Sequence, residues 1–167
     1  FGRTPPCTQR VIEAGIADMH IATLDPNPLV AGKGKAELEA AGIRVVVGQG
    51  EAEARALNQA FFKHITTGRP FVTAKWAMTL DGKMAAQSGD SRWVTGEAAR
   101  VRVHELRDIV DAIVVGVGTV IADDPQLTAR PVTATGRAPR LNQRPLRVVV
   151  DSAGRIPLTA QLLGPEL

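Results

Sequence analysis

Three blocks of the sequence carry side chains that could do chemistry. The first is Cys7, which follows Gly-Arg-Thr-Pro-Pro and directly precedes a predicted helix over residues 8–14. A cysteine at a helix N-terminus lies at the positive end of the helix dipole, and this position suits a thiolate that binds a metal. The alternative is a lone cysteine that packs as a small buried apolar residue. The residues by themselves leave both interpretations open.

The second block combines a tight turn, a polar loop and a tryptophan. Asp81-Gly82 is typical of a tight turn, and residues 87–92 offer hydroxyl groups and backbone donors. Trp93 stands beside this loop and could cover a flat ring. The alternative is a solvated hairpin with Trp93 in the core, so these residues indicate a binding loop only in combination with other signals.

The third block is glycine-rich and runs from Gly116 to Pro125, with Thr119 and Asp123 inside it. Glycines at the end of a strand let the backbone approach a phosphate, and the N–H groups of a following helix can receive it. The block is not a Rossmann fingerprint, because Ala122 stands near the required third glycine and the predicted helix is too short. Thr119 could instead cap this helix, and Asp123 could simply end it.

The elements that must position these blocks alternate between strands and helices, which predicts an α/β protein with parallel strands. The break in periodicity at residues 66–70 predicts a domain junction there. Thr95 is expected to cap the helix that carries Val101, Leu106 and Val110. The other expected helices cover residues 8–14, 33–41, 51–65 and 117–122, and the expected strands cover residues 20–24, 43–47, 71–79, 111–116 and 146–150.

The composition of the chain excludes some classes of binding partner. The 20 basic and 17 acidic residues of the 167 are mostly interspersed and tyrosine is absent, so we expect no nucleic-acid partner. A single cysteine and the lack of a long apolar run predict a cytoplasmic protein with no membrane partner. Because the chain starts at Phe1 and stops at Leu167 after an apolar segment, we expect it to be cut at both ends. An arginine-rich stretch is interpreted as a solvated loop, with a dedicated anion site as the alternative; it contains Arg130, Arg137, Arg140, Arg144 and Arg147.

The three blocks together resemble one known family. The string that ends in Cys7 resembles the second zinc-ligand segment of riboflavin-type members of the cytidine-deaminase superfamily. Residues 74–95 and 116–130 resemble the opening of a reductase domain with a dihydrofolate-reductase-like fold. Both resemblances occur in this order in the bifunctional pyrimidine deaminase/reductase family of riboflavin biosynthesis, and they are weakest over residues 132–143.

The resemblance implies a fold and an activity. Residues 1–68 would be the C-terminal part of a cytidine-deaminase-like α/β domain, and residues 69–167 the N-terminal part of a dihydrofolate-reductase-like α/β domain. The family deaminates a diamino-ribosylaminopyrimidinone phosphate and then reduces its ribosyl group to ribityl with NADPH. Cys7 matches one zinc ligand, and the others would precede Phe1. Since His20 begins a predicted buried strand, it is a poor substitute, and we expect neither stable zinc nor turnover from this chain.

The resemblance also assigns residues to ligands. An arginine can take a phosphate bidentately, which suits a phosphorylated ribosylaminopyrimidine substrate. The alternatives are an exposed helical arginine at position 107 and a loop charge at position 130. The implied substrate-binding residues are Ser91, Arg107, Leu127 and Arg130, and the implied cofactor-binding residues are Ala77, Trp93, Thr119, Asp123 and Ser152.

The sequence also bears on oligomeric state and on two alternative functions. Two-domain members of the family commonly form homo-oligomers, so we expect one here. A nucleic-acid or nucleoside deaminase would explain Cys7 but not residues 74–130. A non-catalytic nucleotide-binding or assembly module is the rival from a different functional class.

Overall fold

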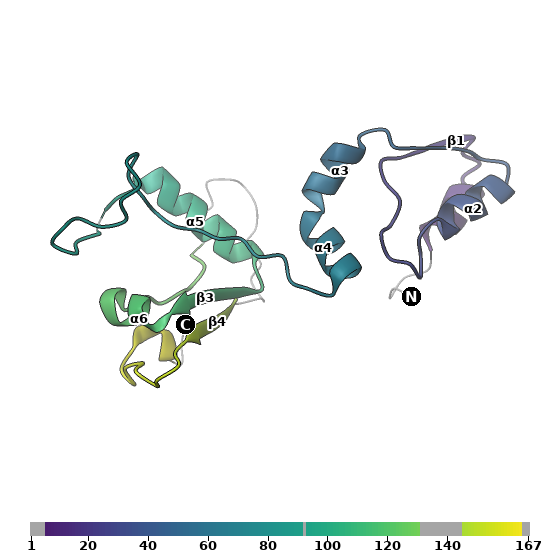
Figure 1. The fold of residues 1–167 in the computed structure, drawn as a ribbon. Coiled ribbons are helices and arrows are strands. Elements are labelled where there is room, and N and C mark those ends of the chain that lie inside the picture. Colours follow the sequence, from purple (N-terminus) through teal and green to yellow (C-terminus); the bar gives the residue numbers. More distant parts are fainter. Residues whose placement is uncertain (1–5, 92, 131–144, 165–167) are drawn as a thin grey trace. The chain divides into compact units, whose positions relative to one another are not determined.

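The computed structural model describes residues 6–91, 93–130 and 145–164. The chain divides into two compact units, Phe1–Lys75 and Trp76–Leu167. Each unit contains a two-stranded parallel sheet with helices (Figure 1), so the α/β class and the parallel strand pairing are confirmed. No helix in the described part of the chain is long and apolar enough to span a bilayer.

The first unit opens with α1 (Cys7–Glu13), as predicted, and pairs β1 (Asp18–Ile21) with β2 (Arg44–Val47). α2 (Lys33–Ala40) connects the two strands. It ends in a Schellman motif, in which the Ile43 N–H donates to the Leu38 carbonyl at 3.1 Å. Gly42 supplies the left-handed residue of this motif, with φ at +83°. Leu38 and Ile43 are the buried apolar residues that this ending brings together.

β1 differs from the predicted buried strand over residues 20–24. It begins two residues earlier, at Asp18, and its residues alternate between exposed and half-buried. It stops at Ile21 because its partner β2 stops at Val47, after which the Gly48 N–H donates to the Ile21 carbonyl at 3.0 Å. His20 is therefore exposed rather than buried.

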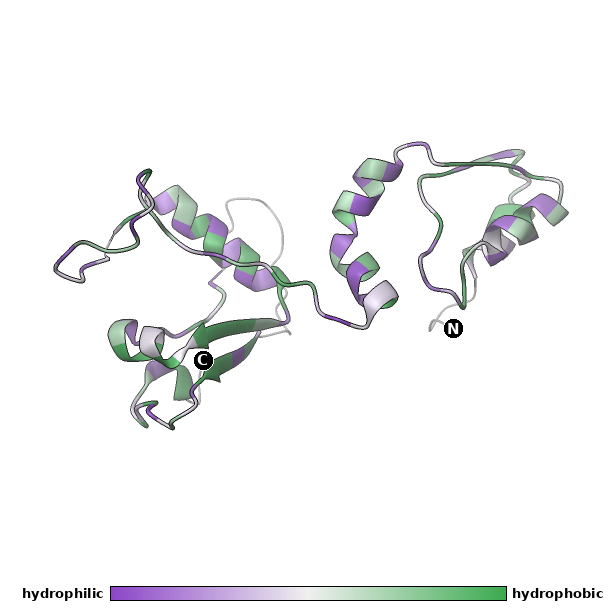
Figure 2. Cartoon of the chain, in the orientation of Figure 1, coloured by the Kyte–Doolittle hydropathy of each residue, from purple (hydrophilic) through white to green (hydrophobic). Residues whose placement is uncertain are grey.

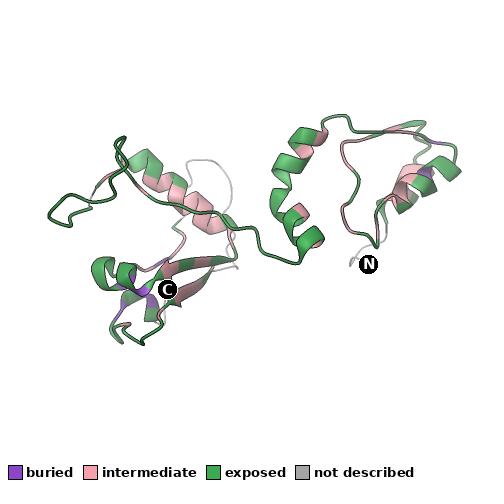
Figure 3. Ribbon diagram, viewed as in Figure 1, coloured by how far each residue is buried: buried purple, intermediate pink, exposed green. Residues whose placement is uncertain are grey.

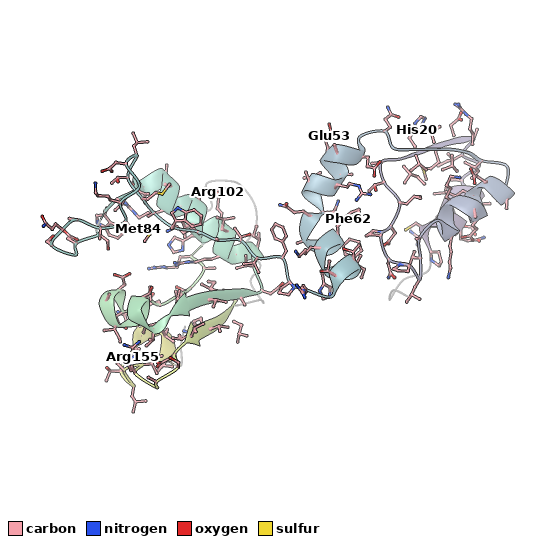
Figure 4. The ribbon with its side chains drawn as sticks, in the orientation of Figure 1. His20, Glu53, Phe62, Met84, Arg102 and Arg155 are labelled. Atoms are coloured by element: carbon pink, nitrogen blue, oxygen red, sulfur yellow. The ribbon has the colours of Figure 1, made fainter. Side chains whose placement is uncertain are left out.

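The helix predicted over residues 51–65 is two helices, α3 (Glu51–Leu57) and α4 (Gln59–Thr67). Asn58 interrupts them with φ at −110°, and its side-chain amide donates to the Ala54 carbonyl at 2.9 Å. A short polar side chain that bonds the preceding turn competes with the helix ladder, which explains the break. Across it, the Arg55 guanidinium lies 4.9 Å from the ring centre of Phe62, which is labelled in Figure 4.

The second unit contains α5 (Glu97–Ile109), β3 (Ala112–Gly116), α6 (Val117–Asp123) and β4 (Leu146–Val150). A short 3-10 helix, η2 (Gln161–Leu163), follows β4. The two strands pair in parallel with Val115 opposite Val149, and Figure 2 shows both as largely hydrophobic. The predicted strands over residues 111–116 and 146–150 and the predicted short helix over 117–122 are confirmed to within one residue.

The core of the second unit lies between α6 and the segment after β4. Val120 is 1% exposed and clusters with Ala160 and Leu162, and Figure 3 marks buried positions in these segments. Val115, Val149 and Ile156 pack against this cluster from one face of the sheet and the following turn. The opposite face of the sheet carries three exposed apolar side chains, Val114, Leu146 and Val150.

The strand predicted over residues 71–79 is wrong. These residues belong to no helix or strand, because a strand requires a hydrogen-bonding partner and none of the described strands pairs with them. Phe71, Val72, Trp76 and Met78 are exposed. The β-propensity of this segment is therefore not sufficient to make it part of a sheet.

We expect Val120→Ala to destabilise the second unit by about 2 kcal/mol, because it removes two buried carbon groups and leaves a cavity. Ile121→Ala is the matched control on the same helix, since Ile121 is 52% exposed, and we expect it to cost less than about 0.5 kcal/mol. Hydrogen exchange of the β3 and β4 amides in the full chain measures both losses. Equal losses would contradict this core.

Candidate functional site

A cleft of about 380 Å³ lies between α6 and the polar loop in the second unit. Three of the predicted site residues meet there, namely Ser91 from the loop and Thr119 and Asp123 from α6. Each segment also contributes one glycine, Gly89 from the loop and Gly118 from α6. The full set of lining residues is Ala85, Gly89, Asp90, Ser91, Gly118, Thr119, Ala122 and Asp123.

Two consecutive turns shape the loop that forms one wall of this cleft. In the first, predicted from Asp81-Gly82, the Gly82 N–H donates to the Thr79 carbonyl at 2.9 Å. The Lys83 ammonium donates to the Asp81 carboxylate at 2.7 Å. This bond, and then a second from the Thr79 hydroxyl, hold the pKa of Asp81 below its ordinary value.

The second turn closes when the Ala86 N–H donates to the Asp90 carbonyl at 2.8 Å. Gly89 has φ at +87°, a conformation that other residues rarely adopt. This turn brings Asp90 and Ser91 to the cleft. Met84, labelled in Figure 4, lies between the two turns.

α6 supplies the other wall, because one face of this helix is buried and another faces the cleft. Val117 and Val120 are buried, whereas Thr119 and Asp123 line the cleft. The helix is capped by Gly116 and not by Thr119, so the capping role considered for Thr119 is wrong. Asp123 is the last residue of α6, so it both ends the helix and lines the cleft.

The two aspartates of the Asp-Asp-Pro block have different roles. Asp124 has φ at +41°, and its carboxylate accepts hydrogen bonds from the Gln161 backbone at 2.8 Å and the Gln161 amide at 3.1 Å. Asp124 therefore ties the end of α6 to η2, while Asp123 is the one that lines the cleft. The sequence does not distinguish these roles, because both residues are aspartate.

Trp93 is 74% exposed, so its placement in the core of a hairpin is wrong. The Arg100 guanidinium lies 4.4 Å from the centre of its ring, a cation–π contact. The Arg100 Nη1 also donates to the Thr95 carbonyl at 2.8 Å. Thr95 does not cap α5 as predicted, because Gly96 occupies that position with no side-chain cap. Arg100 thus holds the tryptophan ring from one side, a role that the sequence analysis missed.

A second cluster joins α5 to the segment that follows α6. The Arg107 Nη1 donates to the Thr128 carbonyl at 3.3 Å, and the Arg130 backbone N–H donates to His104 Nδ1 at 3.2 Å. Arg107 is half-buried and not the exposed helical arginine of the alternative. Arg130 is exposed. His104 is the residue of this cluster that the sequence analysis missed.

Electrostatic effects in this cluster follow from burial and from its two guanidinium groups. Burial, followed by the charge of Arg130, lowers the pKa of Arg107. Burial, then the charges of Arg107 and Arg130, lowers the pKa of His104, against an opposing contact with the Thr128 backbone. An anion between the two arginines would relieve their mutual repulsion. The cluster is therefore a cationic site next to a neutral imidazole.

Leu127 places its side chain in the core, where it is 3% exposed. Its φ of +53° is unusual for a branched residue. The described lining of the cleft does not include Ala77, which is half-buried, or Ser152, which is exposed in the turn after β4.

Cys7 is exposed at the first position of α1, so the interpretation as a buried apolar residue is wrong. In the described residues, no three His, Cys, Asp or Glu side chains are grouped so that they could hold a metal ion. The described residues therefore do not form a complete zinc site.

Part of the predicted motifs lies outside the described residues. Residues 2–5 of the string before Cys7 belong to this part, as does Arg92 of the polar loop. Arg137, Arg140 and Arg144 of the arginine-rich stretch also fall there. Arg147 is described, and it lies in β4 and not in a loop.

Comparisons with known proteins agree with one another. The model of the family described as the RibD C-terminal domain matches residues 70–166. The riboflavin biosynthesis protein RibD of Aquifex aeolicus is 49% identical over 99% of this chain and 45% of that protein. RibD of Actinobacillus pleuropneumoniae is 49% identical over 97% of this chain and 41% of that protein.

Solved structures are similar over the same range. Acinetobacter baumannii RibD matches with a TM-score of 0.84 and 46% identity over 99% of this chain and 46% of that chain. A diaminohydroxyphosphoribosylaminopyrimidine deaminase/5-amino-6-(5-phosphoribosylamino)uracil reductase from Thermotoga maritima matches with a TM-score of 0.83 and 42% identity, over 99% and 45% of the two chains.

The chain spans less than half the length of these relatives. The family model covers more than half of this chain, however, and the relatives align along nearly all of it. The family resemblance of the sequence motifs is confirmed: the chain belongs to the RibD C-terminal domain family.

Proposed function

We propose that this chain is part of an enzyme of riboflavin biosynthesis, in which residues 69–167 contribute to an NADPH-dependent reductase domain. Its substrate is a phosphorylated ribosylaminopyrimidine. The observation that carries this proposal is the cleft where Ser91, Thr119 and Asp123 meet. The family resemblance implies that each of these residues contacts a ligand, and they come from two separate segments of the chain.

The domain assignment belongs to the same proposal. Residues 1–68 are the C-terminal part of a zinc deaminase domain, and residues 69–167 are the N-terminal part of the reductase domain. The position of Cys7 at the start of α1 supports the first assignment. Because the described residues do not complete a zinc site, we derive no deamination step for this chain.

The composition of the cleft fits part of a nucleotide cofactor. Pockets for small ligands commonly have volumes of about 300–1,000 Å³ and a few placed polar groups, and this cleft has about 380 Å³ with Thr119 and two glycines among its lining residues. When bound, NADPH supplies the hydride that reduces the ribosyl group. Thr119 and Asp123 orient the cofactor, while Trp93 offers the exposed side of a ring that Arg100 holds in place.

The arginine cluster fits the phosphate of the substrate. Arg107 and Arg130 lie close enough to repel one another, and both guanidinium groups can donate two parallel hydrogen bonds to a phosphate. Ser91 contributes a hydroxyl to the ligand from the cleft. Leu127 fixes the path of the segment that carries Arg130, through its buried side chain.

The proposal extends to the location and the assembly of the protein. We propose a cytoplasmic homo-oligomer that has no nucleic-acid or membrane partner. The interspersed charges of the sequence support the lack of a nucleic-acid partner.

NADPH binding tests the proposed cofactor cleft. We expect Thr119→Val to weaken NADPH binding to the full chain about tenfold, because it removes one hydrogen-bonding hydroxyl without changing the side-chain volume much. Thr159→Val is the matched control, since Thr159 is exposed in the same unit and does not line the described cleft. Calorimetric titration of both variants measures the difference.

The same titration separates the rival functions. Equal affinity of the two threonine variants for NADPH would contradict the cleft as the cofactor site. A chain that binds neither NADPH nor ribose 5-phosphate would favour a non-catalytic assembly module.

Phosphate recognition is tested at the arginines. We expect Arg107→Lys to weaken binding of ribose 5-phosphate about tenfold, because lysine loses the bidentate geometry. Arg102→Lys is the control on the same helix, where Arg102 is exposed and paired with Glu105 at 2.7 Å. Titration followed by calorimetry compares the two variants, and a similar loss in both would count against a specific phosphate site.

A further inference from the structure

We propose that His104 is a positioning residue of the phosphate site, and that its neutral imidazole holds the main chain of Arg130 against α5. The two arginines can then approach the same anion only while His104 is unprotonated. This inference rests on the proposed function, because it assumes that Arg107 and Arg130 bind the substrate phosphate.

The geometry of the hydrogen bonds carries the inference. His104 Nδ1 accepts the Arg130 N–H at 3.2 Å, and the Thr128 carbonyl accepts from Arg107 at 3.3 Å. The segment after α6 is thus attached to α5 at two residues, through its main chain in both cases. Because Nδ1 accepts, the proton of the neutral ring must be on Nε2.

Burial and two nearby arginines favour this neutral form over an opposing contact with the Thr128 backbone. Arg107 lies on the same helix and Arg130 on the segment packed against it, and both disfavour a third positive charge. Arg100 and Asp108 lie one turn to either side of His104 on α5. Burial and the two arginines hold the pKa of His104 below its ordinary value, so the imidazole is neutral at neutral pH.

Protonation of His104 would release the segment. A proton on Nδ1 removes the acceptor of the Arg130 N–H and adds a positive charge beside two arginines. Since the pKa is lowered in the folded state, the attachment is complete above the ordinary histidine pKa of about 6.5. It is lost as the pH falls from there through the lowered value.

Three substitutions separate attachment from titration. His104→Asn keeps an acceptor oxygen near the position of Nδ1 but cannot be protonated, whereas His104→Leu removes the acceptor. His64→Asn is the control, because His64 is an exposed histidine on α4 of the first unit. The probe is inorganic sulfate, which stays a dianion over the pH range in which histidine titrates.

We expect sulfate binding to the full chain to weaken about tenfold as the pH falls through the lowered pKa of His104, because the hydrogen bond to Arg130 is lost. His104→Asn should bind at every pH as the unsubstituted chain binds at neutral pH. His104→Leu should bind about tenfold more weakly throughout, and His64→Asn should behave as the unsubstituted chain. Unchanged binding in His104→Leu at neutral pH, or an unchanged pH profile in His104→Asn, would overturn the inference.

An NMR titration without any ligand keeps this inference separate from the proposed function. The Arg130 amide signal should shift together with the His104 ring signals in the unsubstituted chain, and that shift should vanish in His104→Asn. If this result is obtained but sulfate does not bind, the attachment stands and the phosphate site fails. If the Arg130 amide does not respond to the protonation of His104, the positioning role is wrong whatever sulfate does.

Discussion

Burial of one face of α6 is the constraint on which the cleft depends. Val120 packs against Ala160 and Leu162, which come from a segment beyond β4, and this contact sets the rotation of the helix about its own axis. With an angle of about 100° between successive residues, Thr119 lies about 100° and Asp123 about 60° around the helix axis from Val120, so both are on the flank next to the buried face. The parallel register of β3 and β4 fixes where the helix begins. The cleft is thus a consequence of packing on the adjoining face of a two-turn helix.

A second constraint acts at Leu127, whose left-handed backbone turns the chain after α6. A branched residue in that conformation is strained by roughly 1 kcal/mol, and burial of a leucine side chain contributes about 1.5–3 kcal/mol in the opposite direction. The balance favours the turn. The turn leads the chain to Thr128 and Arg130, whose main-chain atoms form hydrogen bonds with Arg107 and His104 of α5. The family resemblance implies that Leu127 binds the ligand, whereas the structure gives its side chain a role in the core.

Local signals in the sequence predict much of this fold. Gly42 ends α2, β-branched residues mark β2 and β4, and Asp81-Gly82 forms its turn. What could not be predicted depends either on a partner strand elsewhere in the chain or on the choice of a side chain to bond its own helix. Residues 71–79 have strand propensity but no partner among the described strands, and the helix over 51–65 is broken by one asparagine side chain.

The candidate site shows the same division. Thr119, Asp123 and Ser91 are predicted as site residues because they lie in motifs that resemble the family, and the structure brings them to one cleft. Arg100 and His104 lie in an ordinary amphipathic helix, with no motif around them. Their roles depend on Trp93 and Arg130, which reach them only through the folded loops. A residue whose role is to position another residue is therefore hard to recognise from the spacing of residue types in the sequence.

The contact between His104 and Arg130 uses the backbone of residue 130 and not its guanidinium. The path of the chain and the chemistry of the side chain at this position are therefore independent of one another. Evolution could exchange the side chain to suit a ligand with a different charge while the loop keeps its course, provided that the new residue is not proline, which has no N–H to donate.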